Sequence, residues 1–227
     1  MSQKDTIKYL IGIDEVGRGP LAGPVAVCSF MIKDDLLLKN QEENKLPKLK
    51  DSKKLSAKQR EIWFEYLKKS KNEGLCDYCV SFVSGEFIDK FGINKCIQKA
   101  LNESLAKVTS QSLLNFSRFT PEGPYTDKNS EDSASLFSSY YIYLDGGLHA
   151  PVEYVNQETI IRGDELHPVI SMASIMAKVT RDRIMVKYSK DYPGYGFEKH
   201  VGYGTKAHYE AIKTNGQTPI HRKTYIH

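Results

Sequence analysis

The alternation of apolar and polar positions along the chain predicts a fold that mixes strands and helices. Short apolar or alternating runs rich in β-branched and aromatic residues are typical of strands. We expect strands at residues 7–16, 25–32, 76–83, 140–144 and 154–161. Apolar residues that recur at a period of 3.6 indicate helices. We expect helices that begin at Ser56 and near Asn94, and two more over 170–188 and 205–214. This order of elements predicts a mixed α/β sheet with packed helices.

Local signals mark where some of these elements begin and end. Ser56 is followed three residues later by Gln59, the pattern of a helix capping box. Gly216 is placed to stop the last helix. Residues 110–139 are rich in Ser, Thr, Asn, Asp and Pro, so we interpret them as a long surface insertion.

Composition favours a globular protein of the cytoplasm. Hydrophobic residues make up 40% of the 227 residues and aromatic residues 11%, which suffices for a core and excludes global disorder. The longest apolar run, 20–32, is broken by Gly and Pro and is shorter than the about 20 residues that span a bilayer. The first five residues lack the apolar centre of a signal peptide. We therefore expect a cytoplasmic protein with no membrane association.

Charge and cysteine content add two limits. The net charge of +4 permits a nucleic-acid partner but does not require one. Four cysteines are too few for a disulfide framework in a chain of this size. Cys76 and Cys79 form a lone C-x-x-C pair without the second ligand pair of a zinc site, so we interpret them as ordinary strand residues.

Acidic residues stand at three separate strand ends, each beside glycine. Asp14 and Glu15 come where the first strand meets a glycine turn, Asp145 follows 140–144, and Asp164 follows 154–161. Ligands of α/β sheets collect at the carboxyl ends of strands. If these ends are neighbours, four carboxylates converge and need cations to be tolerated. Oxygen ligands suit Mg²⁺ or Mn²⁺, and two such ions can promote phosphodiester hydrolysis.

A simpler interpretation exists for two of these acids. An Asp before or after Gly is usually a turn residue, and taken singly Asp145 and Asp164 fit that description. The adjacent pair Asp14 and Glu15 is harder to explain in this way, because paired acids rarely end a buried strand without a partner.

The glycine turn itself suggests a rival function. Residues 17–22 match G-x-G-x-x-A after a strand, the fingerprint of dinucleotide binding. That fingerprint must open a helix, whereas Pro20 and Pro24 prevent one here and a strand follows. Asp14 and Glu15 would also place negative charge beside the pyrophosphate. The turn Gly17, Arg18 and Gly19 is better suited to the close approach of a nucleic-acid backbone.

Two basic segments are candidates for phosphate contact. Lysines flank Asp51 and Ser52 just before the first helix. On the predicted helix 170–188, Ser174, Lys178 and Arg181 fall on one polar face. Either set could be a solvated surface, and beside the acids either could contact the phosphates of a substrate.

Taken together, these segments resemble ribonuclease HII. The resemblance rests on blocks that occur in the family's order and span nearly the whole chain: 12–25, 51–55, Asp145-Gly146, Gly163-Asp164, 173–182, 195–197 and 200–203. The chain departs from the family pattern at 110–139, which is longer than expected, and at Val201, where a lysine is common.

The resemblance implies a ribonuclease H-like fold, with a five-stranded mixed sheet flanked by helices and a C-terminal helical appendage. It divides the chain into a catalytic domain, 1–190, and a substrate-contacting segment, 191–227. It implies a monomeric, Mg²⁺- or Mn²⁺-dependent endoribonuclease. The expected substrates are the RNA strand of RNA–DNA hybrids and ribonucleotides embedded in duplex DNA, cut on their 5′ side to leave 3′-hydroxyl and 5′-phosphate ends. The alternative is a non-catalytic protein that binds hybrids.

The resemblance also implies roles for individual residues. Asp14, Glu15, Asp145 and Asp164 are the catalytic acids that bind metal, whereas Asp182 is structural. Gly17, Arg18 and Gly19 form the turn that senses the 2′-hydroxyl, and Tyr203 packs at the ribose of the junction. A last group consists of candidate phosphate contacts, namely Ser52, Lys53, Ser174, Lys178 and Arg181.

Overall fold

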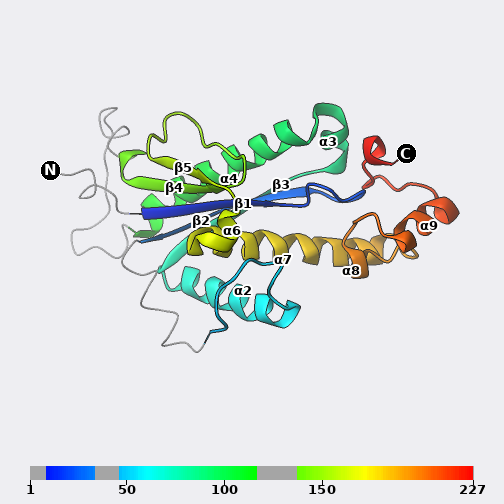
Figure 1. Cartoon of the computed structure of the whole chain (residues 1–227), viewed down its shortest axis with the longest axis horizontal. Coiled ribbons are helices and arrows are strands. Elements are labelled where there is room, and N and C mark those ends of the chain that lie inside the picture. The colour runs from blue at the N-terminus through cyan, green and yellow to red at the C-terminus, as the bar shows by residue number, and fades with distance from the viewer. Residues whose placement is uncertain (1–8, 34–45, 117–136, 227) are drawn as a thin grey trace.

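The computed structural model describes residues 9–33, 46–116 and 137–226, and its centre is one five-stranded sheet (Figure 1). The strands are β1 (Tyr9–Val16), β2 (Val25–Lys33), β3 (Cys76–Val83), β4 (Tyr140–Asp145) and β5 (Gln157–Ile160). They lie in the order β3-β2-β1-β4-β5. β1, β4 and β5 run parallel, whereas β2 is antiparallel to both of its neighbours. The predicted mixed sheet is therefore confirmed.

Helices cover both faces of the sheet, because the strands are apolar on both sides. On one face lie α3 (Gly85–Phe91) and α4 (Ile93–Phe116) (Figure 1). Ile11, Ile13 and Val27 point to this side and pack in one core cluster with residues of α4. On the other face lie α2 (Ala57–Asn72) and α7 (Pro168–Asp191), which share a second cluster with Phe30.

Helix α2 begins as the sequence predicts. The Ser56 hydroxyl accepts the backbone N–H of Gln59, and the Gln59 side chain accepts the backbone N–H of Ser56. This reciprocal pair satisfies two N–H groups that the first turn of the helix leaves without intrahelical partners. The apolar face of α2 then buries Trp63, Phe64 and Leu67 against the sheet side that α7 shares.

Close contact between β1 and α7 depends on Gly12. A Cβ atom at this position would lie 2.2 Å from the carbonyl oxygen of Val169. No side chain can occupy that space unless α7 moves away from the sheet. The glycine thus sets how near α7, with its side chains Ser174 and Lys178, comes to the end of β1.

The C-terminal segment forms a small lobe at one end of the sheet (Figure 1). It contains α8 (Phe197–His200), α9 (Lys206–Asn215) and the short 3₁₀ helix η4 (Lys223–Tyr225). Thr205 caps α9, and Gly216 follows its last residue as predicted. The lobe packs on the turn between β1 and β2 through backbone bonds such as Leu21 N–H to the Gly202 carbonyl, 2.8 Å.

Buried histidines hold this lobe together. His208 bonds the carbonyl of Tyr203 through Nδ1 at 3.0 Å and faces Nε2 of His221 through Nε2 at 3.1 Å. Nδ1 of His221 accepts the backbone N–H of Thr218 at 2.8 Å. This pattern is complete only if both rings are neutral, since a further proton would set two donors face to face. Burial lowers the pKa of His208 to about 4 and also lowers the pKa of His221.

Some boundaries differ from the sequence predictions. β5 begins only at Gln157, because Tyr154 turns back to bond the Pro151 carbonyl. α4 continues to Phe116, so the first residues of the predicted insertion 110–139 are helical. The part of that insertion at 117–136 lies outside the described residues. The short helices α3, α6 (Gly163–Leu166) and α8 were not predicted, since they are too short to show a helical period.

Cys76 and Cys79 lie in β3 as ordinary strand residues, and both are free thiols. None of the described helices has the combined length and apolar character needed to cross a membrane.

Candidate active site

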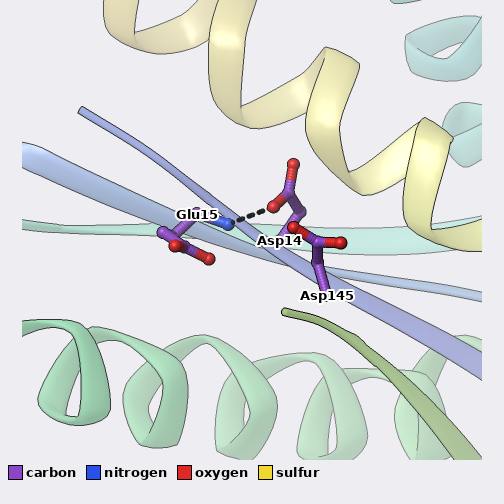
Figure 2. Close-up of side chains that lie close together, drawn as sticks. All are labelled: Asp14, Glu15 and Asp145. Atoms are coloured by element: carbon purple, nitrogen blue, oxygen red, sulfur yellow. Dashed lines mark hydrogen bonds between the residues drawn. The ribbon is translucent and has the colours of Figure 1, made fainter. Parts of the chain in front are cut away.

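Three carboxylates meet where β1 and β4 end side by side. The two strands are parallel, and Ile13 pairs with Leu144, so Asp14 and Asp145 follow at neighbouring positions. One oxygen from each of Asp14, Glu15 and Asp145 lies within 4.8 Å of the other two (Figure 2). The convergence predicted from the strand ends is thus present for these three residues.

Asp14 and Glu15 reach the site from opposite faces of β1. The buried Asp14 side chain points to α7, where the Ser174 hydroxyl is its hydrogen-bond partner. Glu15 instead meets Arg18, whose guanidinium donates to Oε1 at 2.9 Å. The same guanidinium donates to Asn94 at the start of α4 at 2.7 Å. The backbone N–H of Glu15 donates to Asp14 at 2.8 Å and links the two acids (Figure 2).

Asp145 and Asp164 are linked through the backbone. The N–H of Gly163 donates to Oδ1 of Asp145 at 2.6 Å, and the N–H of Asp164 lies 3.4 Å from the same oxygen. A Cβ at position 163 would lie 2.5 Å from Cδ1 of Ile170, so a larger residue there would require the end of the Ile170 side chain to move. The carboxyl of Asp164 is buried beside that of Asp51 and lies 3.6 Å from the Lys53 ammonium.

Burial and mutual repulsion raise the pKa values of these carboxyl groups. Burial, and then the charge of Glu15, raise the pKa of Asp14 well above its usual range. Burial also raises the pKa of Glu15, against the opposing effect of Arg18. The pKa of Asp164 is raised by burial and then by Asp145. Each shift reports a negative charge that the protein alone accommodates poorly.

The donor set fits a divalent metal ion. All its ligands are carboxylate oxygens, the type that Mg²⁺ and Mn²⁺ prefer. Oε2 of Glu15 is buried and has no hydrogen-bond partner among the described residues. A buried carboxylate oxygen without a donor is costly unless a cation reaches it. Asp14, Glu15 and Asp145 can therefore hold such an ion, with Asp164 at the edge of the group.

The other predicted site residues fall into two groups. Arg18, Gly19, Lys53 and Tyr203 are exposed, and the charged groups of Arg18 and Lys53 lie beside Glu15 and Asp164, whereas Gly17 is buried. Ser52 and Ser174 are buried and bonded to each other, with their hydroxyl oxygens 2.7 Å apart. Both are thus placed to orient other groups rather than to form an open surface.

The two charged residues of the predicted polar face of α7 differ. Lys178 is partly exposed and donates to Asp182 at 2.6 Å, an ion pair that agrees with a structural role for Asp182. Arg181 corrects the prediction of a phosphate contact, because its side chain is fully buried. Its nitrogens bond the backbone carbonyls of Pro24, Ala22 and Val201. The C-terminal lobe covers this part of α7 and leaves Arg181 no surface on which to meet a substrate.

Three residues at or near the site escaped the sequence analysis. Asp51 lies against Asp164, and Asn94 accepts a hydrogen bond from Arg18. Arg222 donates to the Gly17 carbonyl of the glycine turn. Asp51 stands within the lysine-rich block, so its position in a recognised motif was a usable signal. Neither Asn94 nor Arg222 stands in such a block.

Comparison with known proteins decides the family. The model of the family described as Ribonuclease HII matches residues 11–227, which include all four acids. The chain belongs to the ribonuclease HII family. A ribonuclease HII of Endomicrobium trichonymphae is 40% identical over 214 residues, which cover 94% of this chain and 83% of that relative.

Solved ribonucleases agree with this assignment. The ribonuclease H2 of Pyrococcus horikoshii superposes with a TM-score of 0.58 at 26% identity, covering 95% of this chain and 93% of that one. The ribonuclease HII of Archaeoglobus fulgidus, in a structure of its complex with PCNA, gives 0.60 at 25% identity and covers 95% and 94%. The ribonuclease H-like fold is therefore confirmed.

Membership in the ribonuclease HII family fixes the general activity. The protein is an endoribonuclease, a hydrolase that cleaves the RNA of RNA–DNA hybrids, and the activity requires a divalent metal. The rival dinucleotide-binding interpretation of residues 17–22 is wrong, since a strand rather than a helix follows the turn.

Proposed function

We propose that Asp14, Glu15, Asp145 and Asp164 are the catalytic acids of this ribonuclease HII and bind its metal ions. The single observation that carries the proposal is the approach of three carboxylates, from two parallel strands, to within 4.8 Å of one another. Their raised pKa values support it, because groups held at such a cost are typical of functional sites.

We propose Mg²⁺ or Mn²⁺ as the ion. When bound, two such ions supply an activated water and stabilise the departing 3′-oxygen of the scissile phosphodiester. The chain's own residues prepare the ligands: Ser174 orients Asp14, Arg18 holds Glu15, and the Gly163 N–H fixes Asp145. The Lys53 ammonium beside Asp164 brings positive charge to the place where a phosphate would enter.

The proposed substrates are RNA–DNA hybrids and DNA duplexes that contain ribonucleotides. Cleavage 5′ of the ribonucleotide would leave 3′-hydroxyl and 5′-phosphate ends. We assign recognition of the 2′-hydroxyl to Gly17, Arg18 and Gly19, and contact with the ribose to Tyr203, a residue that is 42% exposed. Lys53 and Lys178 are the proposed phosphate contacts, whereas Ser52 and Ser174 act through the residues that they orient.

The proposal gives the two parts of the chain different tasks. Residues 1–190 supply the acids and residues 191–227 supply Tyr203 and the support of the glycine turn. We propose that the protein acts in the cytoplasm as a monomer, since one chain provides every residue named here. A purely hybrid-binding role does not explain the acids, because four carboxylates would repel phosphate in the absence of metal.

The test is cleavage of a DNA duplex that carries one ribonucleotide, with Mg²⁺, with Mn²⁺ and with a chelator. The matched control is the same duplex with deoxyribose at that position. We expect cleavage only with metal and only at the ribonucleotide, with a 5′-phosphate on the downstream product. Cleavage in the presence of chelator, or equal cleavage of both duplexes, would contradict the proposal.

A further inference from the structure

Two buried arginines lie beneath the glycine turn that joins β1 to β2. Arg181 comes from the middle of α7, and Arg222 comes from the loop just before η4. Both side chains are fully buried. Neither forms an ion pair with a carboxylate in the described part of the chain. Burial of a charge without a counter-charge is unfavourable, so we expect other polar groups to stabilise the two guanidinium groups.

The stabilising groups are backbone carbonyls, which accept hydrogen bonds from both guanidinium groups. Arg222 donates to the carbonyl of Gly17 at 2.7 Å, to that of Arg18 at 3.0 Å, and to that of Gly23 at 2.9 and 3.0 Å. Arg181 donates to Pro24 at 2.8 Å and to Ala22 at 3.3 Å. A planar guanidinium offers five donors in a fixed fork, which an ammonium group cannot reproduce.

These bonds decide which way the turn presents its backbone. The carbonyls of Gly17 and Arg18 point inward to Arg222, while residues 18 and 19 are exposed. Within the described part of the chain, the N–H groups of Arg18 and Gly19 form no hydrogen bond. They are thus available to an oxygen-rich ligand such as a sugar hydroxyl or a phosphate.

Gly17 is fitted to the same arrangement. Its φ of +94° favours glycine, and a Cβ there would lie 2.3 Å from Nε of Arg181. The turn and the arginine are therefore packed directly against each other. Any side chain at position 17 would displace either the guanidinium or the turn.

The C-terminal segment that carries Arg222 is itself anchored on both sides. The N–H of Arg222 donates to the Leu21 carbonyl at 2.7 Å. The Asp89 carboxylate of α3 accepts the N–H groups of Lys223 at 2.8 Å and of Thr224 at 3.0 Å. Burial and the neighbouring Arg181 lower the pKa of Arg222 to about 10, so the group is still charged at neutral pH.

We propose that Arg222, together with Arg181, is a positioning residue that orders the Gly17–Gly19 turn for contact with the ribonucleotide. This inference deepens the proposed function and rests on it, because it assigns substrate contact to the turn. Arg222 touches neither the acids nor the substrate. It acts by holding two carbonyls of the turn inward, which leaves the N–H groups free to face outward.

The kinetic test compares Arg222→Gln and Arg222→Lys with Arg183→Gln on the duplex that carries one ribonucleotide. Arg183 lies on the same helix as Arg181, but its guanidinium pairs with Glu61 and Glu65 of α2 and not with the turn. We expect both Arg222 variants to raise KM by about 10- to 100-fold, the range for a misplaced binding group. Their kcat should stay within about threefold of wild type, because the acids are untouched. Arg183→Gln should keep the wild-type KM.

A merely structural role gives a different result. Partial unfolding would lower kcat in proportion to the folded fraction and leave KM unchanged. That outcome, or a wild-type KM in Arg222→Lys, overturns the proposal, the latter because charge alone would then suffice. If the Arg222 variants fail to fold, Asp89→Asn is the second test. It weakens the anchor of Lys223 and Thr224 without removing Arg222, and it should raise KM to a smaller extent.

A second measurement does not depend on cleavage. Amide hydrogen exchange of the peptide that contains residues 20–24, whose Leu21, Ala22 and Gly23 N–H groups donate to the carbonyls of Gly202 and Ile220, should be faster in Arg222→Gln than in wild type and unchanged in Arg183→Gln. Unchanged exchange in Arg222→Gln would show that Arg222 does not order the turn. If the wild-type protein fails to cleave the ribonucleotide duplex while exchange responds as expected, the proposed function is wrong but Arg222 still orders the turn.

Discussion

The carboxylate of Asp145 accepts the backbone N–H of Gly163 at 2.6 Å, which ties the end of β4 to the first turn of α6. Because Asp164 follows directly, this single bond places a fourth acid beside the three that converge at the ends of β1 and β4. The carboxyl ends of the inner strands β1 and β4 thus concentrate negative charge at a fixed position, and this concentration has consequences that can be measured with and without metal.

Asp14→Asn should abolish cleavage and stabilise the metal-free protein. The amide keeps the shape of the side chain but removes one of the repelling charges, so the unfolding midpoint without metal should rise by about 2–4 °C, which corresponds to about 1 kcal/mol in a protein of this size. Turnover should fall at least about 100-fold. Thermal unfolding in chelator and the single-ribonucleotide assay measure the two effects.

Glu165→Gln is the matched control for Asp14→Asn. Glu165 is the neighbour of Asp164 in sequence, and it pairs with Lys54 at 2.5 Å outside the carboxylate cluster. This variant should cleave normally. An active Asp14→Asn enzyme would remove Asp14 from the metal site.

The stabilisation that Mg²⁺ provides should grow as the pH rises. The folded-state pKa values of Asp14, Glu15 and Asp164 are raised, so the metal-free protein is favoured while these acids are protonated and loses stability as the pH rises through their pKa values. Bound ions remove this repulsion, because they bind the ionised form. The difference in unfolding temperature with and without Mg²⁺ should therefore be larger at pH 8 than at pH 5. An equal difference at both pH values would show that these acids do not bind the ion.

Tyr203→Ala should impair cleavage at a single embedded ribonucleotide by about tenfold, the loss expected when one stacked ring is removed. Tyr203→Phe should retain most activity if the ring makes the contact. Phe87→Ala serves as the control, because Phe87 is an aromatic residue of comparable exposure, 46% against 42%, on α3. Steady-state kinetics on the single-ribonucleotide duplex measure these effects, and unchanged rates in Tyr203→Ala would assign the ribose contact elsewhere.

Acid should loosen the C-terminal lobe. His208 and His221 are held neutral and their folded-state pKa values are lowered, that of His208 to about 4. Their contribution to stability is therefore present above pH 6.5 and is lost as the pH falls toward 4, by about 1 kcal/mol per pH unit for one fully coupled group. Urea unfolding at several pH values measures the slope. His208→Gln should be less stable at neutral pH but should lose part of this slope, whereas His149→Gln, at an exposed position, should retain it.

Gly12→Ala should destabilise the fold by about 3 kcal/mol, because the new methyl group would collide with the backbone of α7 at Val169. Gly147→Ala is the control, since a Cβ at that position meets no atom within 4 Å. Urea unfolding of both variants makes the comparison. Equal stability of the two would mean that α7 shifts freely against β1.

The site could be predicted from the sequence where its residues directly follow strands that a local apolar pattern reveals. Asp14 and Asp145 each follow an apolar run, and parallel pairing of those runs brings the acids together. Arg181 shows the limit of this reasoning. The helical period correctly put it opposite the apolar face of α7, but only the complete fold shows that a second layer covers that polar face. Asn94 and Arg222 were missed for the same reason, because their contacts join segments that no local pattern connects.

The bond between Gly17 and Arg222 joins positions 205 residues apart. Contacts of such long range form late in folding, since the entropy of closing the intervening chain must be overcome first. A ribosome delivers the early strands long before the partner of this turn exists. The Gly17–Gly19 turn therefore reaches its final shape only after residue 222 has been translated, whereas β1 and β4, which bear Asp14, Glu15 and Asp145, have already been synthesised.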